Sequence, residues 1–93
     1  MRIEFATPEE QLNPENDNAD IFLHLDDGRV YGLLVATPSS IYWCMDNEGT
    51  DHYFGVPPLF VRILTRKAVE AAVEALLKEQ KWLNVYGSLQ TRG

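Results

Sequence analysis

The chain has 93 residues, enough for one small domain, and we expect residues 1–93 to form it. Hydrophobic residues make up 45% of the chain and charged residues 24%, a composition that excludes intrinsic disorder. The net charge of −6 repels phosphate groups and anionic lipids, so we expect neither a nucleic acid nor a membrane as partner.

The charges are unevenly distributed along the sequence. Residues 1–58 carry two basic and eleven acidic side chains, a net charge of −9, and residues 59–93 carry six basic and three acidic ones, a net charge of +3. If the first part forms a sheet and the second a helix, the molecule presents an acidic side that complements a basic partner. The alternative is that the acidic residues serve solubility alone.

The sequence also predicts where the protein is located. Its single cysteine, Cys44, cannot form an internal disulfide. No basic segment followed by an apolar run comes after Met1, and no stretch approaches the ~18 apolar residues of a transmembrane helix. We therefore expect a soluble protein of the cytoplasm.

The N-terminal segment predicts one strand and one helical turn. Residues 2–5 alternate polar and apolar side chains, which is typical of a short strand with Ile3 and Phe5 facing inward. Thr7 and Pro8 then favour the start of a helix, which Pro14 ends after about one turn.

The strongest local signal is a hairpin over residues 21–35. Two apolar runs flank Asp26-Asp27-Gly28-Arg29, and Asp-Gly at such a place favours a two-residue turn. Closing the hairpin on Asp27 and Gly28 predicts Leu23 opposite Gly32 and Phe22 opposite Leu33. In this register one face carries Ile21, Leu23, Leu25, Val30 and Leu34, and the other carries Phe22, Leu33 and Val35, with His24 and Tyr31 nearer the turn.

Residues 41–56 predict a second hairpin. Two runs rich in aromatic and β-branched residues, 41–45 and 53–56, flank the polar segment 46–51. With Gly49 in the left-handed position of a three-residue loop, Trp43 lies opposite Tyr53.

The C-terminal part predicts a short strand over residues 59–64 and one amphipathic helix over residues 65–80. Thr65 is a suitable N-cap. The apolar stripe of this helix, at helical spacing, consists of Val69, Ala72, Val73, Leu76 and Leu77. Residues 81–86 either extend this helix or form an edge strand, and residues 87–93 are expected to be a frayed tail.

These elements predict an α+β fold. Its sheet is antiparallel, with four to six strands built from two hairpins, and the C-terminal helix packs on one face. Because one helix covers one face only, the second apolar face of the first hairpin needs another cover. The N-terminal segment and the C-terminal tail are one candidate cover, and a second copy of the chain is the other.

Three residues bear on catalysis or metal binding: Cys44, His24 and His52. No nucleophile motif surrounds Cys44, and the three lack the paired spacing of zinc ligands. The scattered glycines form no phosphate-binding loop. We therefore expect a protein that is not an enzyme and holds neither a metal nor a cofactor, and a small enzyme or metal protein that uses these three residues is a weaker alternative.

The aromatic residues of the predicted sheet and the acidic turns indicate a protein-binding module. The general make-up of the chain resembles that of small bacterial accessory proteins, including immunity proteins that neutralise toxins. Our main hypothesis is an inhibitor or immunity-type protein that neutralises a basic partner such as a nuclease toxin. The predicted contact residues are Asp26, Asp27, Tyr31, Trp43, Asp46, Glu48, Asp51 and Tyr53.

The alternative hypothesis is a homodimeric structural or regulatory subunit. It would associate through the sheet face formed by Phe22, Leu33 and Val35, because a large exposed apolar face is most simply buried against a second copy.

Overall fold

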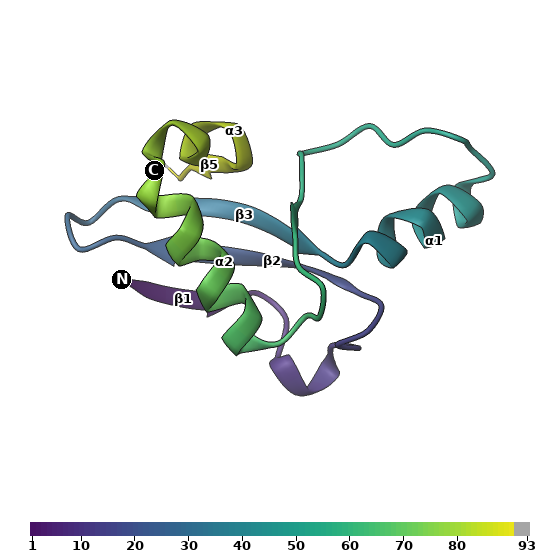
Figure 1. Cartoon of the computed structure of the whole chain (residues 1–93), viewed down its shortest axis with the longest axis horizontal. Helices are drawn as coiled ribbons and strands as arrows, with labels where there is room; N and C mark the ends of the chain where they lie inside the picture. The colour runs from purple at the N-terminus through teal and green to yellow at the C-terminus, as the bar shows by residue number, and fades with distance from the viewer. Residues whose placement is uncertain (91–93) are drawn as a thin grey trace.

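The hairpin predicted in residues 21–35 lies at the centre of the sheet. In the computed structural model, which describes residues 1–90, β2 (Asn18–His24) pairs with the antiparallel strand β3 (Val30–Ala36) (Figure 1). The loop has three residues, since Leu25 N–H donates to Arg29 O at 2.9 Å and Gly28 N–H donates to Leu25 O at 3.0 Å. Gly28 has a φ of 92°, a left-handed conformation that suits glycine and completes this type of loop.

The register of this hairpin differs by one residue from the predicted register. Leu23 pairs with Tyr31 and Ile21 with Leu33, whereas a two-residue turn would have placed Leu23 opposite Gly32. A one-residue slip turns every side chain of a strand to the other face, so the predicted faces of β3 are wrong. The three-residue loop instead gathers apolar side chains of both strands on one buried face, formed by Ala19, Ile21, Leu23, Tyr31, Leu33 and Val35.

Three further strands complete a mostly antiparallel five-stranded sheet, which confirms the α+β class. β1 (Arg2–Phe5) is antiparallel to β2, and its Ile3 side chain is buried as predicted. β4 (Leu59–Phe60) pairs with β3 in parallel, so the strand predicted over residues 59–64 is only two residues long. β5 (Gly87–Leu89) is antiparallel to β3.

The strand β5 corrects the prediction of a frayed tail over residues 87–93. Leu89 pairs with Tyr31, and Gln90 N–H donates to Val30 O at 2.7 Å. Residues 87–90 are therefore part of the sheet, because the edge of β3 supplies backbone partners that sequence periodicity does not reveal. Residues 91–93 of the predicted tail lie outside the described residues.

A helix occupies the segment for which a second hairpin was predicted. α1 (Pro38–Glu48) has Pro38 in its first turn and ends at Gly49, whose φ is 70°. Proline suits the first turn because its missing N–H would have no partner there, and glycine suits the left-handed residue that ends a helix. The second hairpin is therefore wrong, and so is the pairing of Trp43 with Tyr53.

The predicted helix over residues 65–80 is α2 (Arg66–Lys78). Thr65 Oγ1 accepts a hydrogen bond from Ala68 N–H at 3.2 Å and caps its start. Residues 1–90 also contain the short helices η1 (Glu9–Gln11), η2 (Gln80–Trp82) and α3 (Leu83–Tyr86). Because η2 and α3 cover residues 81–86, this segment is helical and is not an edge strand. Within residues 1–90 no helix combines the length and the apolar character that crossing a membrane requires.

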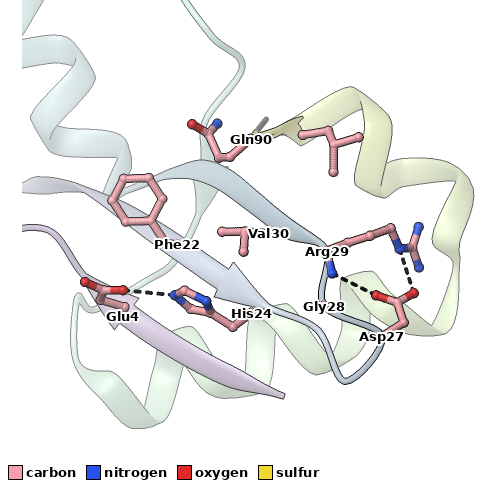
Figure 2. A pocket seen from close by; sticks show the side chains of 9 residues that line it. Glu4, Phe22, His24, Asp27, Gly28, Arg29, Val30 and Gln90 are labelled. Carbon is pink, nitrogen blue, oxygen red and sulfur yellow. Dashed lines mark hydrogen bonds and ion pairs between the residues drawn. The ribbon is translucent and has the colours of Figure 1, made fainter. Parts of the chain in front are cut away.

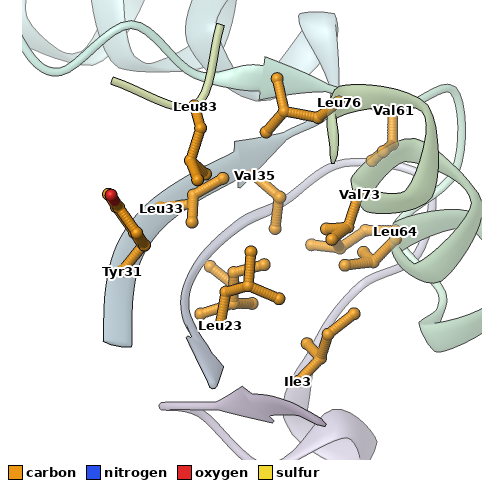
Figure 3. Close-up of a cluster of buried hydrophobic side chains, with 13 residues drawn as sticks. Ile3, Leu23, Tyr31, Leu33, Val35, Val61, Leu64, Val73, Leu76 and Leu83 are labelled. Atoms are coloured by element: carbon orange, nitrogen blue, oxygen red, sulfur yellow. The ribbon is translucent and has the colours of Figure 1, made fainter. Parts of the chain in front are cut away.

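The hydrophobic core lies between the sheet and α2 (Figure 3). Val69 and Val73 of α2 are fully buried, and Leu83 of α3 extends the core over Tyr31 and Leu33. Each such side chain stabilises the fold by roughly 1.5–3 kcal/mol through burial. The opposite side of β2 and β3, which we call the open face, carries Asp20, Phe22, His24, Val30, Gly32 and Leu34.

Arg66 covers part of the outer edge of β1. Its Nη1 donates to Ile3 O at 3.2 Å, its Nε donates to Glu9 Oε1 at 3.0 Å, and its guanidinium lies 4.9 Å from the centre of the Phe5 ring. An unpaired strand edge is a template for the strand of another molecule. The Arg66 side chain therefore blocks one of the backbone acceptors that such pairing would use.

Candidate protein-binding site

The structure divides the predicted contact residues between two ends of the molecule. The loop between β2 and β3 lies at one end of the sheet, and α1 extends beyond the other end (Figure 1). Asp26 and Asp27 are in that loop. Trp43, Asp46, Glu48, Asp51 and Tyr53 all lie on α1 or in the segment that follows it.

Tyr31 is a correction to the predicted site. Its side chain is 5% exposed, and it belongs to the hydrophobic core beside Leu33 and Leu83 (Figure 3). Its hydroxyl accepts a hydrogen bond from Arg29 Nη1 at 3.3 Å. The one-residue difference in hairpin register turned Tyr31 inward, so it is not part of a contact surface.

We call residues 38–56, which comprise α1 and the segment after it, the acidic arm. Its first turn is connected to the body of the protein by Ser39 Oγ, which donates to Glu15 O at 3.2 Å. Within the turn, the buried Ser40 Oγ donates to O of the N-cap residue Thr37 at 2.8 Å. These bonds hold the base of α1 in place. The rest of the helix extends from this base (Figure 1).

One side of α1 carries buried and half-buried side chains, and the other carries large exposed aromatic side chains. Ile41 is buried, and Cys44 and Met45 are half-buried, which is the i, i+3, i+4 spacing of a helix face. Tyr42 and Trp43 lie outside this face and are 69% and 58% exposed. Two large aromatic side chains are therefore neighbours on the exposed side of this helix.

The segment after α1 adds a third aromatic group to the acidic arm. Phe54 is 89% exposed, and its ring centre lies 5.0 Å from that of His52 in a tilted arrangement. Tyr53 is at the border between exposed and half-buried, at 36%. Sequence reasoning noted these aromatic residues as strand residues but did not include Tyr42 or Phe54 among the contacts.

The charges of the acidic arm have one sign. Asp46, Glu48 and Asp51 are all exposed, and the sequence has no lysine or arginine between Arg29 and Arg62. Asp46 and Glu48 also lie at the C-terminal end of α1, where the helix dipole adds negative potential and no basic side chain compensates it. The end of the arm is therefore a strongly negative surface beside exposed aromatic rings.

The acidic residues of the hairpin loop are already paired. Asp26 Oδ1 accepts from the Met1 amine at 2.6 Å. Asp27 Oδ2 accepts from Arg29 Nε at 2.7 Å (Figure 2). The Arg29 backbone N–H also donates to Asp27 Oδ1, and this bond together with the guanidinium lowers the pKa of the Asp27 carboxyl below its usual range. The loop therefore offers less uncompensated charge than the acidic arm.

The open face of the sheet carries two neighbouring cavities. The first has a volume of about 660 Å³ and lies over Phe22 and Val30, with the Glu4–His24 pair on one side, where His24 Nε2 lies 2.9 Å from Glu4 Oε1 (Figure 2). The second has a volume of about 410 Å³ and shares Phe22 and Gln90 with the first. Both fall within the size range of ligand-binding cavities.

The apolar face predicted for a homodimer does not exist as one surface. Phe22 lies on the open face, but Leu33 and Val35 are 2% and 0% exposed in the core. The predicted register placed Leu34 on the face opposite Phe22. In the structure Leu34 is half-buried and lies on the open face together with Phe22. The segments 53–56 and 88–90 border this face, so its apolar side chains are half-buried rather than fully exposed.

Cys44, His24 and His52 lie on three different elements of the chain. Cys44 is on α1, His24 ends β2 beside Glu4, and His52 contacts Phe54 in the acidic arm. Among residues 1–90, no three metal-ligating side chains form a group that could hold an ion.

Comparisons of the chain with protein-family models, with curated proteins and with solved structures found no match.

Proposed function

We propose that this protein is a non-catalytic binding module of the inhibitor or immunity type, which neutralises a basic partner through its acidic arm. The observation that carries the proposal is the exposure of Tyr42, Trp43 and Phe54 beside three carboxylates in a segment without lysine or arginine. Aromatic side chains supply most of the affinity at protein interfaces, and charge complementarity brings the partners together quickly.

The chemistry of the arm favours a partner that itself binds nucleic acid, such as a nuclease toxin. Such a protein carries a basic groove for phosphate groups. The end of α1, with Asp46 and Glu48 next to the helix C-terminus, presents negative charge to that groove. Trp43, one turn earlier, then contacts the wall of the groove, and the arm excludes the nucleic acid by occupying its place.

The anchored base of α1 supports this mechanism. The hydrogen bonds from Ser39 and Ser40 hold the first turn of the helix before any partner arrives. A surface that is already ordered loses less conformational entropy on binding than a flexible loop. The contribution of the arm to affinity therefore depends on its helix as well as on its charges.

A pair of charge-matched variants tests the proposal. The arm variant carries Asp46→Lys and Glu48→Lys, and the control carries Glu10→Lys and Glu74→Lys, two exposed positions outside the arm. Both change the net charge of the chain equally. Tagged wild-type and variant proteins are used to capture partners from a lysate of the cells that make the protein, and the captured protein is purified for rate measurements.

The proposal predicts that wild type and the control capture the same basic protein, and that the arm variant does not. The association rate measured by surface plasmon resonance should fall steeply as salt increases from about 20 to 200 mM. Trp43→Ala should raise the dissociation rate, whereas Trp82→Ala, which truncates a tryptophan of η2 that is 40% exposed, should not. Equal binding by the two charge variants would contradict the role of the arm.

A further inference from the structure

The second cavity of the open face has one charged group in an apolar and aromatic setting. It is lined by Asp20 together with Phe22, Gly32, Leu34, Tyr53 and Val56. We call it the Asp20 pocket. Asp20 and Leu34 are directly opposed in the β2–β3 pair, and Phe22 is opposite Gly32, so four of these residues form a continuous floor.

The side chains above this floor come from the segment after α1. Tyr53 and Val56 line the pocket, although they are distant in sequence from β2. The Tyr53 ring lies over Gly55, where an added Cβ would meet the Tyr53 hydroxyl at 2.7 Å. Two residues of the acidic arm therefore form part of the pocket.

The Asp20 carboxylate is a charged group without a partner in the part of the chain that the structure describes. It is exposed, and within residues 1–90 its oxygens make neither a hydrogen bond nor an ion pair. Among residues 1–90, no lysine or arginine lines the pocket. The charged group that these residues give the pocket is thus negative, and the lining includes the rings of Phe22 and Tyr53, the side chains of Leu34 and Val56, and the polar Ser88 and Gln90.

We propose that the Asp20 pocket binds an arginine side chain of the basic partner. The guanidinium group donates to the Asp20 carboxylate and stacks on the ring of Tyr53 or Phe22, and the methylene groups pack on Leu34 and Val56. Arginine fits better than lysine, because its planar cation is weakly hydrated and stacks on aromatic rings. The pocket volume of about 410 Å³ accommodates one such side chain.

This inference rests on the proposed function for the basic character of the partner, but the pocket can be tested without the partner. The probe is the peptide Ac-Gly-Gly-Arg-Gly-Gly-NH2, titrated into the ¹⁵N-labelled full chain and followed by NMR. Two matched peptides replace arginine with citrulline, which has the same shape without the charge, or with lysine. The expected result is that the arginine peptide shifts the amide signals of residues 20–22, 32–34 and 53–56.

Substitutions separate the pocket from the arm. Asp20→Asn should weaken binding of the arginine peptide about tenfold or more, because a charge-assisted hydrogen bond is lost. Tyr53→Leu should weaken it severalfold through loss of stacking. Glu10→Gln removes one negative charge at a residue that does not line the pocket, and it should leave peptide binding unchanged. The arm variant with Asp46→Lys and Glu48→Lys should still bind the peptide at this pocket.

Several results would overturn the inference. These are equal binding of the citrulline or lysine peptide, an affinity that Asp20→Asn leaves unchanged, or signal shifts confined to α1 (Pro38–Glu48). Sedimentation of the wild-type chain at the NMR concentration is expected to give a monomer, and a dimer in which the same amides are protected would assign the open face to a second copy instead. Binding of the arginine peptide without any basic partner in the lysate would leave the pocket established and the proposed function wrong.

Discussion

Thr37 and Asp17 are joined by backbone and side chain at the base of α1. Thr37 N–H donates to Asp17 O at 3.0 Å, and Asp17 N–H donates to Thr37 Oγ1 at 3.2 Å. Thr37 is 1% exposed. This reciprocal contact connects the end of β3 with the start of β2, and it fixes the point from which the acidic arm begins.

The first prediction concerns this contact. Thr37→Val keeps the shape of the side chain but leaves the part-buried N–H of Asp17 without its acceptor, so we expect a loss of about 1 kcal/mol in the free energy of unfolding. Thr37→Ser keeps the hydroxyl and should lose less. Urea denaturation followed by circular dichroism measures both variants. A larger loss for serine than for valine would show that the methyl group, more than the hydrogen bond, holds the base of α1.

The second prediction tests the register of the β2–β3 hairpin. Leu33 lies in the core and Leu34 lies half-buried on the open face. Leu33→Ala should therefore destabilise the fold by about 2–5 kcal/mol, and Leu34→Ala by clearly less, because a half-buried side chain leaves a smaller cavity. Thermal and urea unfolding of the two variants give the comparison. A larger loss for Leu34→Ala would support the register of a two-residue turn.

These two leucines also show what sequence reasoning achieved in the hairpin. The position of both strands followed from the apolar runs and the Asp-Gly signal, and both were found. The register did not follow, because Asp-Gly is compatible with a two-residue turn and with a three-residue loop that ends in a left-handed glycine. Only the requirement that both strands bury the same face decides between them, and that requirement involves α2, which is distant in sequence.

In residues 38–48, by contrast, the signal that distinguishes a helix from a strand is local in the sequence. Ile41, Tyr42 and Trp43 favour a strand by their intrinsic preferences. Pro38 at the start and Gly49 at the end, however, have the asymmetry of a helix. The buried and half-buried positions 41, 44 and 45 also have helical spacing. Weighing the ends of the segment above its composition would have predicted the helix.

The candidate site shows the same limit of sequence reasoning. Trp43, Asp46 and Glu48 were predicted as contact residues from the aromatic residues of the predicted sheet and its acidic turns, and their role in contact stays a prediction. Their grouping on one arm, away from Asp26 and Asp27, depends on α1 and was not predicted. The Asp20 pocket is formed by residues distant in sequence, so periodicity along the chain does not reveal it.

The third prediction compares two glycines of the sheet. A Cβ at Gly87 would lie 2.8 Å from Leu83 O, a backbone atom that cannot move without α3. A Cβ at Gly32 would lie 2.8 Å from Gln90 Nε2, the end of a flexible side chain. Gly87→Ala should cost about 1–3 kcal/mol and weaken the pairing of β5, whereas Gly32→Ala should change stability by less than about 0.5 kcal/mol. Amide hydrogen exchange of residues 87–90 and urea unfolding measure these effects, and a large loss for Gly32→Ala would contradict the mobility of Gln90.

The fourth prediction concerns the pH dependence of stability that arises from Asp27. The Arg29 backbone N–H, and after it the guanidinium, lower the pKa of this carboxyl in the folded chain. A carboxyl with a lowered pKa stabilises the fold above its ordinary value of 3.8 and loses this contribution as the pH falls through that value and below it. Asp27→Asn lacks this titration, so the difference in unfolding free energy between wild type and variant should shrink as the pH falls from about 5 to about 2.5.

Arg29→Leu is the control for this prediction, because it keeps the backbone N–H that donates to Asp27 and should retain part of the pH dependence. Urea unfolding at each pH measures the three proteins, and a difference that stays constant down to the lowest pH would show that the bonds between Asp27 and Arg29 do not persist in solution.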